Sequence, residues 1–182
     1  MKNILLLIVA SVSLLMMSCG NGKQKLQNEI SASEQKLKND ASGVIDNQKA
    51  AEVIQLYISY AAKFPDDSLS AEYLFRAADV TSGIHQPDKA IELYERVQGF
   101  KTYSKTPIAL FLQGFIAETE LQNMQKAKQF YEKFLKIYPN HQLATDVKIT
   151  LLNLGKSPNE MIKEFEAKAK LDSAKLSGVV YK

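Results

Sequence analysis

The chain has 182 residues, 46% of them hydrophobic, and its formal net charge at pH 7 is +3. A chain of this length can bury one sizeable core, and so small a net charge gives no indication of nucleic acid or an anionic surface as a partner. The only cysteine is Cys19, which excludes an internal disulfide.

The N-terminal residues have the layout of a secretory signal peptide. Met1-Lys2-Asn3 is positively charged, Ile4 to Met17 is almost entirely apolar, and small and polar residues follow. The apolar run is shorter than the ~18 to 20 residues that span a bilayer. We therefore expect residues 1–18 to be a cleaved signal peptide and the chain to leave the cytoplasm.

The end of this segment resembles the lipobox of bacterial lipoproteins. Met16-Met17-Ser18-Cys19 places a small residue directly before the cysteine and an apolar residue three positions before it. The resemblance implies cleavage before Cys19, lipidation of its sulfur, and anchoring of the mature chain by several acyl chains. A chance cysteine near an ordinary cleavage site, or an uncleaved anchor, remains an alternative.

Residues 19–27 are polar, contain glycine and lack an apolar period, which predicts a lipidated flexible tether. Gly20, and not an aspartate, follows the cysteine. Under the lipoprotein sorting rule of some Gram-negative bacteria, this implies the outer membrane. The stretch from Gly20 to Lys25 also lacks an early acidic cluster, which implies a position facing the periplasm.

From residue 28 onward the apolar spacing predicts helices. Ile30, Leu37 and Val44 give a weak helical pattern, which we interpret as the first helix of an array. Clearer i, i+3, i+4, i+7 patterns follow, separated by prolines, glycines and capping residues. These patterns lie between Gln48 and Pro65, Ser68 and Gly83, Pro87 and Gly99, Pro107 and Leu121, Ala127 and Pro139, Leu143 and Gly155, and onward from a capping box at Ser157 to Glu160. No segment shows sustained two-residue alternation, so the predicted fold class is all-α.

One block recurs every 37 residues. A fixed period in this range indicates units that bury their apolar faces only by stacking on their neighbours. Because aromatic residues at helical spacing belong to a core more often than to a contact surface, we expect Tyr57, Tyr94, Tyr131 and Phe134 to be buried. The three copies are Val53-x-x-x-Tyr57-x-x-Tyr60, Ala90-x-x-x-Tyr94-x-x-Val97 and Ala127-x-x-x-Tyr131-x-x-Phe134.

This block resembles the tetratricopeptide repeat. In that family a small residue and a bulky residue four positions later pack the second helix onto the first, and a proline ends the unit; Ala127, Tyr131 and Pro139 have that spacing. Ala90 and Tyr94 match where the proline is absent. The resemblance implies a right-handed solenoid of antiparallel helix pairs, with three to four repeats over residues 28–170 and a C-terminal tail over 171–182.

Within that family, residues 109–116 and 131–139 look most like envelope lipoproteins related to the helical lipoprotein of the outer-membrane β-barrel assembly machinery. This second resemblance implies membership of the same functional class.

The sequence shows no pattern typical of an active site. The two histidines, His85 and His141, lie far apart and have no cysteine or glutamate at metal-ligand spacing. Neither a glycine-rich phosphate loop nor a Gly-x-Ser-x-Gly motif is present. We therefore predict no enzymatic activity, no cofactor and no metal.

Function is then expected on the concave face, which in the resembled family is lined by the first helix of each pair. The mix of apolar and acidic residues there suits an extended or helical peptide segment. For Leu112 and Ile116, simple packing on the neighbouring helix is an equal alternative. The predicted partner-binding residues are Glu72, Phe75 and Asp79, then Leu112, Ile116 and Thr119, then Asp146, Ile149 and Asn153.

Two functions follow from these observations. The first is a membrane-anchored periplasmic scaffold that binds other envelope proteins through its helical-repeat groove, with outer-membrane protein assembly as its process. The alternative is a periplasmic accessory factor that binds peptidoglycan or another small ligand. The partners expected are envelope proteins and, through the lipid on Cys19, the membrane.

Overall fold

The computed structural model describes residues 22–38 and 45–179, and in these residues all regular structure is helical. The predicted all-α fold is confirmed. The predicted signal peptide and the lipidation site at Cys19 lie outside the described residues. The helices are an N-terminal helix over residues 22–38, α2 (Asn47–Lys63), α3 (Ser68–Gly83), α4 (Pro87–Val97), α5 (Thr106–Thr119), α6 (Met124–Ile137), α7 (Ala144–Asn153) and α8 (Pro158–Val179).

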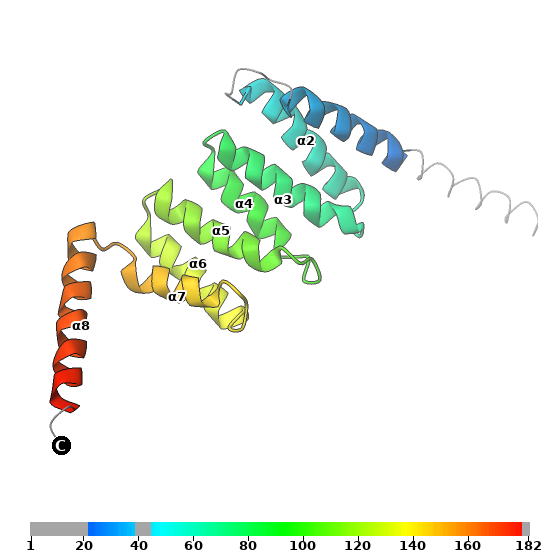
Figure 1. Cartoon of the computed structure of the whole chain (residues 1–182). Helices are drawn as coiled ribbons and strands as arrows, with labels where there is room; N and C mark the ends of the chain where they lie inside the picture. Colours follow the sequence, from blue (N-terminus) through cyan, green and yellow to red (C-terminus); the bar gives the residue numbers. More distant parts are fainter. Residues whose placement is uncertain (1–21, 39–44, 180–182) are drawn as a thin grey trace, which may run out of the picture.

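The helices stack in chain order as a solenoid (Figure 1). From α2 to α7 each helix packs against the next one along the chain, whereas α8 stands away from the stack. We describe the array as four pairs, each with a first and a second helix: residues 22–38 with α2, α3 with α4, α5 with α6, and α7 with α8. In the part of the chain that the structure describes, no helix is long and apolar enough to cross a membrane.

Local signals explain where the helices begin and how the pairs turn. The side chains of Asp46, Asp67 and Asn123 accept backbone N–H groups at the starts of α2, α3 and α6. Prolines stand at the first turns of α4 and α5, where a missing N–H costs nothing. Inside the second, third and fourth pairs, the connection contains one residue with positive φ, namely His85, Gln122 and Gly155.

The recurring aromatic residues form the core, as predicted. Tyr131 and Phe134 are fully buried, and Tyr57 and Tyr94 are 3% and 2% exposed. Tyr73 of α3 packs between neighbouring rings, with its centroid 4.7 Å from that of Tyr60 and 5.3 Å from that of Tyr57. The 37-residue period is therefore the spacing of the core residues on the second helices.

The structure corrects two boundaries. Residues 22–27, expected to be a flexible tether, are the first turns of the N-terminal helix, because Leu26 is buried and Lys23 pairs with Asp67 at the start of α3. Residues 171–179, expected to be a tail, continue α8 to Val179.

Candidate partner-binding groove

The register of the first helices is set by a repeated hydrogen bond. Ser70 Oγ donates to the carbonyl oxygen of Phe64, and Thr106 Oγ1 donates to that of Phe100, six residues back in each case. Ala144 occupies the same place in α7. The backbone N–H of each of Ser70, Thr106 and Ala144 donates to the carbonyl oxygen of the residue three positions before it. Counting from these three residues aligns the first helices. Equivalent sets are Glu72, Ile108 and Asp146; Phe75, Phe111 and Ile149; and Asp79, Phe115 and Asn153.

In α5 this register differs by one residue from the sequence prediction. The small residue that accepts the second helix is Gly114, because a Cβ atom there would lie 2.6 Å from Tyr131 Cε1. Ile116 is only 2% exposed, so its prediction as a surface contact is wrong and it belongs to the core. Leu112 is half-buried, and Thr119 is exposed with its hydroxyl bonded to the carbonyl oxygen of Phe115.

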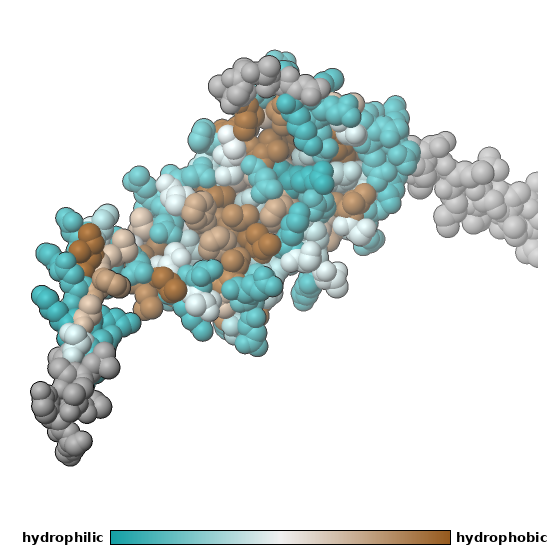
Figure 2. Space-filling model, in the orientation of Figure 1, coloured by the Kyte–Doolittle hydropathy of each residue, from teal (hydrophilic) through white to brown (hydrophobic). Residues whose placement is uncertain are grey.

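Two phenylalanines take the places that the prediction gave to Leu112 and Ile116. Phe115 is 46% exposed, and Phe111 is partly buried. The Phe111 ring lies 6.3 Å from that of Phe115 and 6.0 Å from that of the buried Tyr131. Figure 2 shows hydrophobic residues gathered on the visible face where Figure 1 places α5. The surface of α5 therefore carries an aromatic pair that packs on the core through the contact between Phe111 and Tyr131.

The first half of the array is charged instead. Glu72 accepts hydrogen bonds from Arg76 Nε at 2.7 Å, Lys105 Nζ at 3.0 Å and the Tyr103 hydroxyl. Burial of the Glu72 carboxylate opposes ionisation, but these three donors outweigh it and lower its pKa to about 2. Arg76 Nη1 also reaches Glu34 of the N-terminal helix at 2.9 Å. This ion-pair network joins the first helices of the first two pairs to the loop before the third.

Each of the first three pairs also has a tyrosine hydroxyl that donates to a carboxylate. Tyr57 bonds Glu34 at 2.5 Å, Tyr131 bonds Glu118 at 2.7 Å, and Tyr94 bonds Asp79. Burial and the adjacent carboxylate raise the pKa of each of these tyrosines, so the hydroxyl stays protonated and continues to donate. Glu34, Asp79 and Glu118 are thus already engaged in hydrogen bonds within the fold.

Phe75, like Ile116, was predicted as a surface contact but is buried in the core. It is 7% exposed, with its ring 5.4 Å from that of Tyr94 and Lys105 Nζ 5.0 Å above it. A separate pocket of about 340 Å³ lies between the N-terminal helix, α2 and α3. The residues that line this pocket are Glu34, Leu37, Lys38, Tyr57, Arg76, Asp79 and Val80.

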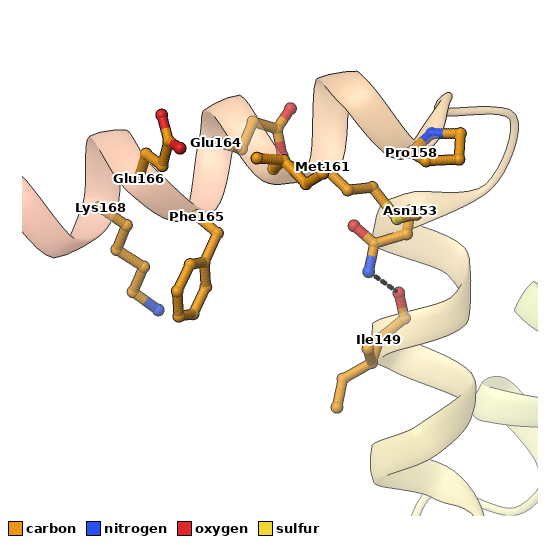
Figure 3. Close-up of a pocket in the computed structure, with 9 residues that line it drawn as sticks. Ile149, Asn153, Pro158, Met161, Glu164, Phe165, Glu166 and Lys168 are labelled. Atoms are coloured by element: carbon orange, nitrogen blue, oxygen red, sulfur yellow. Dashed lines mark hydrogen bonds between the residues drawn. The ribbon is translucent and has the colours of Figure 1, made fainter.

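The predicted residues of α7 lie at the open end of the array. Ile149 is 53% exposed, Asp146 is exposed, and Asn153 Nδ2 donates to the carbonyl oxygen of Ile149 at 3.0 Å. Ile149 and Asn153 line a pocket of about 890 Å³ in the corner between α7 and α8, opposite Met161 and Phe165 (Figure 3). The aligned first helices therefore carry a charged surface at one end and an apolar surface at the other.

In residues 22–38 and 45–179, no three His, Cys, Asp or Glu side chains form a group that could hold a metal ion. His141 Nδ1 accepts the N–H of Leu143, and its ring packs on Phe134 at 5.6 Å. His85 is exposed in the connection between α3 and α4. The His141 ring therefore packs on the core, and His85 is the residue of positive φ in its connection.

The fold and this surface define a helical-repeat protein of stacked helix pairs. Residues 108–141, which cover most of α5 and all of α6, match the family model of the tetratricopeptide repeat. The match supports a tetratricopeptide-repeat protein, and repeats of this family generally mediate interactions between proteins. No curated protein matches the chain.

Proposed function

We propose that this protein is a non-enzymatic scaffold that binds another protein segment across its aligned first helices. The observation that carries the proposal is the aromatic pair of Phe111 and Phe115 on α5, in which Phe115 is exposed and Phe111 packs on the buried Tyr131. Phe115 is 46% exposed although its neighbour Gly114 is buried against Tyr131. Aromatic side chains on a preformed surface are the anchors that most often carry binding energy between proteins.

The distribution of charge indicates the kind of segment that fits. Glu72, Arg76 and Lys105 hold one another in place in the first half, so they offer fixed polar contacts at little entropic cost. Phe111 and Phe115 offer apolar contacts in the second half. A helical or extended segment with apolar anchors at one end and polar residues at the other matches this division.

Site-specific crosslinking tests the groove. A photoreactive residue in place of Phe115 is expected to capture a discrete protein in the intact envelope. The same residue in place of Ile137, which is 50% exposed but lies on the second helix α6, is expected to capture none. Equal capture at both positions would contradict the groove. Retention on peptidoglycan without any protein product would favour the alternative accessory factor.

We further propose that the scaffold is a lipoprotein of the cell envelope, anchored through Cys19 to the outer membrane and facing the periplasm. The Met16-Met17-Ser18-Cys19 motif supports this proposal. Outer-membrane protein assembly is the process that its resemblance to envelope lipoproteins favours. In a fractionation experiment the Cys19→Ser variant is expected to leave the membrane fraction, and its retention there would contradict lipid anchoring. Recovery of β-barrel assembly components in a pull-down from membranes would support the process.

A further inference from the structure

The fourth helix pair is incomplete. In the second and third pairs, the second helix folds back on the first and buries an aromatic residue against it, Tyr94 in α4 and Tyr131 in α6. α7 is packed on α6, but α8 does not fold back along it. The outer side of α7 is consequently open, with Ile149 and Leu152 53% and 71% exposed.

The sequence of α8 nevertheless has the register of a second helix. Tyr94 and Tyr131 each lie seven residues after the first residue of their helix, and Phe165 lies seven residues after Pro158. The connection before α8 contains Gly155 at positive φ, as the two earlier connections contain His85 and Gln122. α8 therefore begins like α4 and α6, with an aromatic residue at the place that those helices bury.

The first helix of this pair lacks the residue that admits the aromatic ring. Counting from Ser70, Thr106 and Ala144, the position of Ala78 in α3 and Gly114 in α5 is Leu152 in α7. A single Cβ atom at Gly114 would already lie 2.6 Å from the ring of Tyr131. A leucine at this position therefore prevents α8 from packing as close to α7 as the second helix packs to the first in the other pairs.

The connection also fixes α8 of the same copy at an angle. Lys156 N–H donates to the carbonyl oxygen of Asn153, Lys156 Nζ pairs with Glu164 at 2.6 Å, and Ser157 and Glu160 form a capping box. Phe165 remains 75% exposed, and in Figure 3 its side chain and that of Ile149 point into the same open corner. Each copy thus exposes both halves of one apolar contact.

We propose that this corner binds α8 of a second copy of the chain, so that two copies complete each other's fourth pair. An α8 from another copy is not held by the four-residue connection, so it can lie along α7 at a separation that Leu152 permits, since helix axes pack over a range of distances. The apolar side chains that α8 exposes in the corner, Met161, Ile162 and Phe165, would then cover the exposed Ile149 and Leu152 of the other copy's α7. Exchange of an identical element is also a low-cost route to a dimer.

Disulfide crosslinking between two differently tagged full-length copies tests this proposal. One copy carries Ile149→Cys and the other Phe165→Cys, and both are oxidised in the same membranes with copper phenanthroline. A disulfide-linked pair containing both tags is the expected result. In the matched control, the second copy carries Lys163→Cys instead of Phe165→Cys. Lys163 is exposed on α8 but does not line the corner, so the disulfide-linked pair should not form. The unaltered chain, whose only cysteine is Cys19, gives the background.

Disulfide crosslinking also distinguishes α8 packing on α7 of another copy from α8 packing on α7 of its own copy. A single chain carrying both Ile149→Cys and Phe165→Cys is expected to give a linked dimer. A linked monomer with no dimer would overturn the proposal, because it would show that α8 covers its own α7. Absence of any product, or equal yield with the Lys163→Cys control, would overturn it as well.

Discussion

The third and fourth helix pairs have the same sequence features, but only in the third pair does the second helix pack against the first. Both have a connection with one residue of positive φ, Gln122 or Gly155, and both carry an aromatic residue seven positions into the second helix. Tyr131 is fully buried, whereas Phe165 is 75% exposed. The difference follows from the first helix, because Gly114 leaves room for the ring and Leu152 at the equivalent position does not.

Truncation of the two aromatic residues is expected to give the largest contrast. Tyr131→Ala removes a fully buried ring and should lower the free energy of unfolding by about 3–5 kcal/mol. Phe165→Ala removes a ring that the single copy does not bury and should change it by less than about 0.5 kcal/mol under dilute conditions. Urea unfolding of the full chain, followed by circular dichroism, measures both. Similar losses for the two variants would show that α8 packs as α6 does.

A methyl group at the close contact of the third pair is expected to have a smaller effect. Gly114→Ala should cost about 1–3 kcal/mol, because the surrounding side chains must move to accept the new Cβ. Gly99→Ala is the matched control, since a Cβ there would meet its nearest atom at 3.4 Å, an ordinary contact. Thermal melting of the two variants gives the comparison. A neutral Gly114→Ala would mean that the small residue does not determine which pair closes.

The smallest expected effect concerns acid stability of the charged first half. The pKa of Glu72 is lowered from its ordinary value of 4.5 to about 2 in the folded chain, so its ion pairs contribute stability above about pH 4.5 that is lost as the pH falls toward 2. Glu72→Gln should lower stability near neutral pH and flatten this dependence. Unfolding midpoints measured between pH 2 and 6 test it, with the exposed Glu52→Gln as a control for the loss of one charge. If the unfolding midpoint of Glu72→Gln depended on pH as steeply as that of the unaltered chain, the stabilising role of the Glu72 ion pairs would be contradicted.

The sequence predicted the second helices better than the first. Tyr57, Tyr94 and Tyr131 recur every 37 residues and are buried as expected. The first helices are spaced differently, because the connection over 120–123 is one residue longer than that over 84–86. Ser70 and Thr106 are consequently 36 residues apart. The pattern of the resembled family placed Ile116 on the surface, but Ile116 is a core residue. Gly114 was the available signal, since the ring of Tyr131 needs a residue without a side chain.

Tertiary contacts explain what local patterns could not predict. Residues 22–27 carry one apolar side chain, Leu26, and no local signal separates them from a tether. They are helical because Lys23 pairs with Asp67 and Gln27 Nε2 donates to the Tyr60 hydroxyl at 3.3 Å, 33 residues away. In the same way, the capping box at Ser157 correctly predicted where α8 begins but not what it packs against.

The short helix α7 also determines where the array first loosens. A linear stack is held by contacts between neighbours, so among the stacked helices α2 to α7 the one that is covered on one side only has the smallest free energy of local opening. α7 has ten residues and packs along α6 alone, whereas α3 packs between α2 and α4. In a single copy, the amide hydrogens of α7 should therefore exchange with solvent deuterium before those of α3. Fraying is then expected to proceed from Asn153 toward the centre of the molecule.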